Sequence, residues 1–315
     1  MNVDELVTHY VAFRRTLGEK YESKETILRA FCRAVGPQTS IIHLGAEVVA
    51  SFLNGRGPVT SAWFNKYHAL NGFFHFAISR GHLTEAPLPK IMPQRPPPFV
   101  PYIYTRDEIR RLLDEIPSSQ HCNALITAET LRALVLLLYG AGLRVSEALA
   151  LTVADVDLPD SLITVWDSKF FKSRLVPVGQ QLTEALAEYA AWRAAFYAGN
   201  DTRKHFFLGK HGFPISLHTM EKTFRRLTEH AGIRRSDGAR YQPRLHDLRH
   251  SAAVHRLIRW YQQGADVQRL LYYLSVYLGH THIRDTQVYL TMTADLLQQA
   301  GGRFERYACG EDHHA

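Results

Sequence analysis

The sequence LHDLRH, residues 245–250, places three cationic side chains on one face of an expected helix. His246, Arg249 and His250 stand at positions i, i+3 and i+4, which lie above one another on a helix surface. Two histidines four residues apart are typical of a metal site, but an arginine between them would set a fixed positive charge beside the metal. A guanidinium group flanked by imidazoles suits an anion better. The stretch therefore predicts a helix over 247–261 that carries an anion site.

Two clusters lie upstream of this stretch. The sequence GLRVSE at 142–147 sets Arg144 after a glycine turn and Glu147 three residues later, where its carboxylate would lie beside the arginine on a helix. Taken alone, such a pair is more typical of a surface ion pair. The sequence SKFFKSR at 168–174 forms the tip of an expected hairpin, and such tips are usually solvated turns. A lysine there, Lys169 or Lys172, would also be able to protonate a leaving oxygen in a groove.

A third cluster lies downstream, where LGHTH at 278–282 is followed by Tyr289. Alone, His280 is more typical of a helix cap or a core residue, and a single tyrosine of packing. Together the clusters supply two arginines, a lysine, histidines and a tyrosine, without a carboxylate pair or a phosphate-cradling glycine loop. Two guanidinium groups balance the charge of a pentacoordinate phosphorus, and a tyrosine assisted by its neighbours is a nucleophile. The combined set predicts chemistry on a phosphodiester.

The remaining sequence predicts two domains. Residues 87–101 contain seven of the fourteen prolines, which favours an extended linker. Helical periodicity over 3–31 and 60–80 predicts a small helical bundle before it. After it, we expect a mainly α domain with a small antiparallel β-sheet. Its predicted helices cover 106–116, 131–139, 181–197, 218–230, 247–261 and residues from 266 onward, and its predicted strands cover 162–166 and 175–178. The predicted limits are 1–86, linker 87–104, 105–300 and a C-terminal tail 301–315.

Composition narrows the function classes. The 315 residues include 37 Lys and Arg against 30 Asp and Glu, a net charge of +7 that is compatible with nucleic acid or an anionic membrane surface. The three cysteines share no short spacing, so neither a disulfide framework nor a zinc knuckle is predicted. The N-terminus lacks the features of a signal peptide, and no apolar run is long enough to span a bilayer. We therefore expect a soluble cytoplasmic protein without membrane partners.

The motifs, in this order, resemble those of the tyrosine recombinase (phage integrase) family. The resemblance covers nearly the whole chain and implies a helical core-binding domain that binds DNA at 1–86, followed by a catalytic domain at 105–300. The catalytic residues that it implies are Arg144, Lys169, His246, Arg249, His280 and Tyr289, with Glu147, His250 and Lys172 in supporting roles. Further candidate DNA contacts in the first domain are Arg14, Arg15, Lys66 and Arg80.

The same resemblance implies a mechanism and partners. Tyr289 would attack a DNA phosphate, leaving a 3′-phosphotyrosyl link and a free 5′-hydroxyl. Lys169 would protonate the leaving oxygen, while His246 would exchange a proton with the tyrosine, and no metal or other cofactor is expected. The substrate would be double-stranded DNA clamped between the domains. A homotetramer would act on two sites through a Holliday junction, with or without accessory or partner recombinases. The tail would pack on a neighbouring protomer or on its own domain.

The sequence departs from the family pattern in three places and leaves three rival functions open. One departure is Thr281-His282, where the family often has serine after LGH. The stretch 264–280 is about four residues longer than in Xer-like sequences, which favours a transposon or integrated-element enzyme for integration, excision or transposition. The hairpin carries Phe170-Phe171 where many relatives have small or polar residues. A type IB-like topoisomerase shares the chemistry. The residues also fit a catalytically silent DNA-binding relative, or a metal-dependent nuclease that uses the histidines, including His282.

Overall fold

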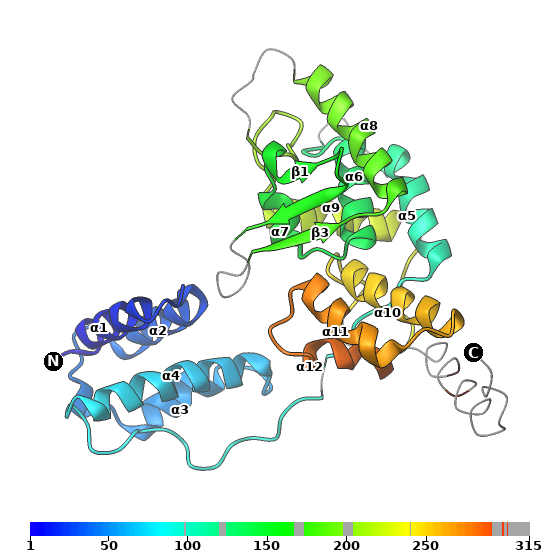
Figure 1. Cartoon of the computed structure of the whole chain (residues 1–315). Coiled ribbons are helices and arrows are strands. Elements are labelled where there is room, and N and C mark those ends of the chain that lie inside the picture. The colour runs from blue at the N-terminus through cyan, green and yellow to red at the C-terminus, as the bar shows by residue number, and fades with distance from the viewer. Residues whose placement is uncertain are drawn as a thin grey trace. The chain divides into compact units, whose positions relative to one another are not determined.

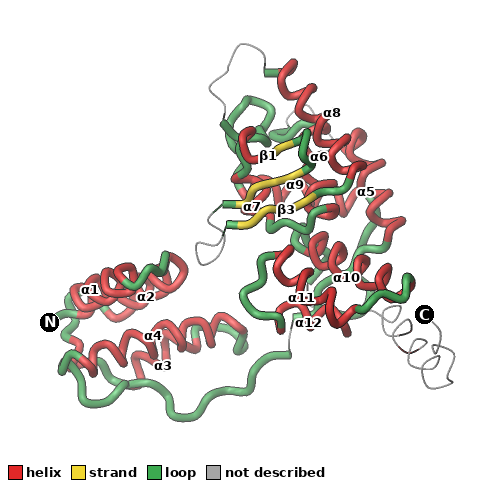
Figure 2. Tube along the Cα trace, viewed as in Figure 1, coloured by secondary structure: helices red, strands yellow, loops and turns green. Residues whose placement is uncertain are grey.

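The computed structural model of the protein divides into two compact units, Met1–Phe99 and Val100–Ala315 (Figure 1). It describes residues 1–97, 99–119, 124–166, 173–197, 204–239 and 241–291, together with Gln298 and Gly301. Helices dominate these residues, and their strands form one three-stranded antiparallel sheet (Figure 2). The predicted fold class, mainly α with a small antiparallel sheet, is thereby confirmed. Within these residues, no helix combines the length and apolar character needed to cross a membrane.

The first unit is a helical bundle. Its elements are α1 (Val3–Thr16), α2 (Glu22–Val35), η1 (Ile41–His43), α3 (Ala46–Asn54) and α4 (Ser61–Ser79). The helical periodicity predicted over 3–31 is divided between α1 and α2, because Gly18 and Tyr21 adopt positive φ angles of 82° and 55°. The short helix α3 was not predicted. Aromatic residues of α4, including the fully buried Phe73 and Phe74, form much of this unit's own core.

The second unit contains the remaining elements. Its helices are α5 (Arg106–Ser119), α6 (Ala128–Gly140), α7 (Val145–Ala150), η2 (Val153–Asp155), α8 (Gln180–Phe196), α9 (Leu217–His230), α10 (Asp247–Gln262), α11 (Val267–Leu278), α12 (Arg284–Gln287) and η3 (Val288–Thr291). The predicted capping box is present at the start of α5, because Thr105 N–H donates to Glu108 (2.8 Å) and Glu108 N–H donates to the Thr105 hydroxyl (3.1 Å).

The core of the second unit surrounds α6, which packs against α5, α8 and α10. Leu131, Leu134 and Leu137 of this helix are fully buried. A second apolar cluster joins α10 and α11 and includes Tyr289. Because α6 ends at Gly140, two residues before the GLRVSE motif begins, its packing fixes the start of the candidate site.

The sheet has the order β1 (Val156–Asp157), β2 (Leu162–Val165) and β3 (Arg174–Pro177). The two predicted strands are present, and β1 is an addition. Strand β2 pairs with β3 in the register Val165 opposite Arg174 and Ile163 opposite Val176. Side chains alternate across a strand, so Arg174 lies on the same face as the fully buried Val176. The strand thereby directs an arginine inward.

Candidate active site

Arg144 is the residue immediately before α7, and Glu147 fixes its position. Its backbone N–H donates to Glu147 Oε2 (3.0 Å), and its Nη1 donates to Oε1 of the same carboxylate (2.7 Å). Its Nη2 donates to the Gly279 carbonyl (2.8 Å), 135 residues away in the chain. The predicted pair is therefore part of a tertiary contact, rather than an isolated surface ion pair.

Arg249 lies in the first turn of α10 and is 2% exposed. Its Nη1 donates to the Gly142 carbonyl (2.7 Å), and its Nη2 donates to the Leu278 carbonyl (2.6 Å). Burial, followed by the nearby charge of Arg144, lowers the pKa of Arg249 to about 10, so the group remains a cation at neutral pH. Two positive charges are thus fixed near each other by backbone carbonyls.

The segment that follows α11 brings His280 and Tyr289 to these arginines. Gly279 ends the helix in the left-handed region (φ 69°). The hydroxyl of the fully buried Thr286 is hydrogen-bonded to His280 Nδ1 (2.7 Å). Tyr289 is 3% exposed. Its ring centroid lies 5.5 Å from that of His250 and 6.0 Å from that of His280. His246 adjoins His250 in turn, with centroids 5.0 Å apart.

The environment favours neutral histidines and a protonated tyrosine. Burial is the main cause that lowers the pKa values of His246 and His280 to about 4 and that of His250 to about 3. The positive charge of Arg249 contributes in each case. Burial also raises the pKa of Tyr289, while the charge of Arg249 and its hydrogen bond with the hydroxyl act in the opposite direction. Each imidazole is therefore available as a proton acceptor at pH 7.

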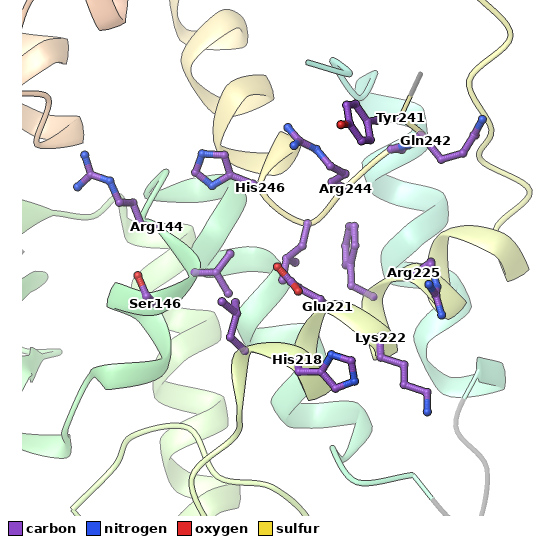
Figure 3. Close-up of a pocket in the computed structure, with 15 residues that line it drawn as sticks. Arg144, Ser146, His218, Glu221, Lys222, Arg225, Tyr241, Gln242, Arg244 and His246 are labelled. Atoms are coloured by element: carbon purple, nitrogen blue, oxygen red, sulfur yellow. The ribbon is translucent and has the colours of Figure 1, made fainter. Parts of the chain in front are cut away.

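A groove of about 820 Å³ opens beside Arg144 and His246. It extends along α9 past His218, Lys222 and Arg225 (Figure 3). Its charged lining residues are four cations, Arg144, Lys222, Arg225 and Arg244, and one acid, Glu221, so it forms an electropositive path away from the arginines. Within the described residues, no cluster of three or more His, Cys, Asp or Glu has the arrangement of a metal site.

The structure brings together Arg144, His246, Arg249, His280 and Tyr289, with Glu147 and His250 beside them. Lys169, Lys172 and the predicted tail beyond residue 301 lie outside the described residues. In the first unit, Arg14 pairs with Glu19, Arg15 pairs with Glu25, Lys66 donates to the Phe52 carbonyl and Arg80 lies over the Phe76 ring. These four remain predicted DNA contacts.

Sequence reasoning missed two residues that shape the site. Arg174 donates to Glu147 from β3, and its signal was its place after the two hairpin lysines. Arg244 fixes the entry to α10, because its backbone N–H (2.8 Å) and its Nη2 (3.0 Å) both donate to the buried Asp247. No local pattern distinguishes Arg244 from other cationic loop residues.

Comparison with known proteins gives concordant matches. Residues 103–295 match the phage integrase family. The chain is 32% identical over 304 residues to y4rB of Sinorhizobium fredii, a protein classed as an integrase/recombinase, and the match covers 95% of this chain and 96% of that one.

Two solved structures share the fold. The integrase of transposon Tn1549, in complex with transposon right end DNA, matches with a TM-score of 0.68 and 17% identity over 98% of this chain and 100% of that one. The lambda integrase tetramer bound to a Holliday junction matches with a TM-score of 0.65 and 17% identity, over 92% of this chain and 77% of that one.

Proposed function

The chain belongs to the phage integrase family of site-specific tyrosine recombinases, and on that premise we propose that it cuts and rejoins duplex DNA through Tyr289. The observation that carries this assignment is the position of Tyr289, which is buried beside Arg249 and between His250 and His280. A tyrosine in a positive field with neutral imidazoles nearby is prepared to lose its proton when a phosphate arrives.

The proposed reaction is a transesterification. The Tyr289 oxygen forms a bond to phosphorus as the bond to the 5′ oxygen breaks, which leaves a 3′-phosphotyrosyl link and a 5′-hydroxyl. His246 accepts the tyrosine proton, and Lys169 donates one to the leaving oxygen. Arg144, Arg249 and His280 bind the non-bridging oxygens, where charge grows in the transition state. Rejoining reverses these steps without a nucleotide cofactor.

The proposed partners are double-stranded DNA and further copies of the chain. The electropositive groove beside Arg144 supports DNA binding. The likeness to a transposon integrase and to a tetrameric phage integrase supports an assembly of four protomers on two sites, in the service of a mobile element. Integration, excision and transposition all use this same exchange of strands.

Covalent trapping tests the proposal. The substrates are nicked suicide duplexes from the boundaries of the element that carries the gene, incubated with wild type or Tyr289→Phe both in EDTA and without it. We expect a DNA-shifted protein band on a denaturing gel for the wild type alone, with equal DNA binding by both proteins. A band that persists in Tyr289→Phe, or that disappears only in EDTA, would contradict it.

A second substrate separates recombination from topoisomerase activity. A duplex that carries two copies of the site is incubated with the wild type, and the flanking sequences are followed by their lengths. A recombinase exchanges the flanks, whereas a topoisomerase reseals each strand to its original partner. Relaxation of supercoils without exchange would identify the enzyme as a topoisomerase instead.

A further inference from the structure

Arg174 is held by three hydrogen bonds at the inner face of β3. Its Nη2 and Nη1 donate to the two oxygens of Glu147 (2.8 and 3.2 Å), and its Nε donates to the Tyr277 carbonyl (3.0 Å). The side chain is 10% exposed. A planar guanidinium with a hydrogen bond from each of its three nitrogens is held in one orientation, and its carboxylate partner is constrained with it.

Glu147 is shared between Arg174 and Arg144. Burial alone would raise the pKa of Glu147, but hydrogen bonds and charge from Arg174, together with hydrogen bonds from Arg144, lower it to about 2. The carboxylate is therefore ionised and bound from both sides. Because Glu147 Oε1 accepts from Arg144 Nη1, any rotation of the carboxylate moves the guanidinium of Arg144.

Three arginines converge on the end of α11. Arg174, Arg249 and Arg144 donate to the successive carbonyls of residues 277, 278 and 279. These are groups that an α-helix leaves without internal partners, at the negative end of its dipole. Together with the Glu147 carboxylate, the carbonyls offset the mutual repulsion of three cations. The end of α11 and the two arginines of the anion site therefore share one bonded network.

The close fit at Gly279 shows how tightly Arg174 is packed into this network. A Cβ atom at Gly279 would lie 2.8 Å from Arg174 Nη1 and 2.9 Å from its Cζ. The guanidinium thus lies directly against the backbone that leads to His280 and Tyr289. Its burial and its three hydrogen bonds leave it inside the protein, so we expect it to act through neighbouring residues rather than by contact with DNA.

We propose that Arg174 is a positioning residue for DNA cleavage, which orients Arg144 through Glu147 and fixes the end of α11 against both arginines of the anion site. This inference rests on the proposed function. Under this proposal the position of Arg144 depends on the paired hydrogen bonds of the Arg174 guanidinium, which lysine is unable to form. A residue that only stabilises the fold would have no such requirement.

The test compares Arg174→Lys and Arg174→Ala with the wild type on the suicide duplex. We expect covalent cleavage to fall about 100-fold in both variants, since small misplacement of catalytic groups has effects of this order. DNA affinity should stay within about threefold, because the side chain does not reach the substrate. Free guanidinium ion should raise the cleavage rate of Arg174→Ala at least about tenfold. It should not raise that of Arg174→Lys, because the lysine side chain fills the space.

The matched control is Arg256→Lys. Arg256 is an exposed arginine of α10 that lies over the Tyr277 ring (5.4 Å), so it touches the same helix end without joining the carboxylate network. Its cleavage rate should match the wild type within about twofold. Cleavage by Arg174→Lys at the wild-type rate, or a loss in Arg174→Ala that guanidinium does not restore, would overturn the inference while leaving Tyr289 as the nucleophile.

A double-mutant cycle in denaturant unfolding measures the coupling without DNA. Glu147→Gln should lower the unfolding midpoint of Arg174→Gln by less than that of the wild type, because only the contacts of Glu147 with Arg144 are then left to lose. Additive shifts would overturn the inference whatever the cleavage result. If the wild type forms no adduct, the proposed function fails, and this arm still decides whether Arg174 fixes Glu147.

Discussion

His250 lies close to both His246 and Tyr289 and is held in its neutral form. Its Nδ1 atom is buried and, within the described residues, has no hydrogen-bond partner. Burial, and then the charges of His246, Arg244 and Arg249, lower its pKa from 6.5 to about 3. A proton on this ring would find no acceptor at Nδ1 and would add to the positive charge of the site.

Acid should therefore destabilise the protein through His250. In the unfolded chain the imidazole takes up a proton near pH 6.5, whereas in the folded chain it does so only near pH 3. The unfolded state thus binds more protons in between, and stability falls as the pH is lowered through this window. His250→Phe and His250→Gln should both reduce this loss by about 1–2 kcal/mol between pH 6.5 and 4.5, measured by urea unfolding.

The two variants serve as controls for each other. At pH 7, His250→Phe should be at least as stable as His250→Gln, because phenylalanine places no polar atom in the buried position. The free energy of unfolding should nevertheless depend on pH in the same way in both variants, since neither side chain titrates. A slope equal to that of the wild type in both variants would show that His250 is not the group responsible.

At the scale of elements, α11 combines a helix end with part of the active site. Gly279 terminates the helix with φ 69°, a conformation that costs residues with a Cβ atom about 1–2 kcal/mol. Gly264, after α10, has the same φ of 69°, but a Cβ atom there would meet nothing within 4 Å. The two glycines share a backbone conformation, but only Gly279 leaves no room for a Cβ atom, because it lies against Arg174.

Gly279→Ala should lower stability by about 1 kcal/mol more than Gly264→Ala, because only the former displaces a packed guanidinium. Covalent cleavage should fall at least about tenfold in Gly279→Ala and stay near the wild-type rate in Gly264→Ala. Thermal unfolding and the suicide-duplex assay measure the two effects. Equal behaviour of the two variants would mean that the Arg174 contact has no energetic consequence.

Local patterns predicted most elements, and long-range contacts account for what they missed. The helix expected over 247–261 is α10, and the expected capping box of α5 is present. Arg174 escaped prediction because its partners Glu147 and Tyr277 lie 27 and 103 residues away, beyond any periodicity. The division between α1 and α2 depends on Tyr21 in a left-handed conformation, which tertiary packing imposes against the preference of the residue.

At the scale of the whole molecule, each unit has its own apolar core, so each should fold alone. We expect a fragment of residues 1–99 to be helical by circular dichroism and to unfold cooperatively in urea. A fragment of residues 100–315 should still form the covalent adduct, but only at higher DNA concentration, because it lacks the contacts of the first unit. Non-cooperative unfolding of residues 1–99 would show that the units depend on each other.

The carbonyl contacts at the end of α11 also have a consequence during synthesis, because the candidate active site is complete only after its last residues have been made. Arg144 binds a carbonyl 135 residues further along the chain, and Arg249 binds one 107 residues before it. A ribosome adds about 5–20 residues per second, so Tyr289 is synthesised roughly seven to thirty seconds after Arg144. Until then the chain has neither the proposed nucleophile nor the helix end that binds the arginines. We therefore expect a nascent or prematurely terminated chain to be unable to cleave DNA.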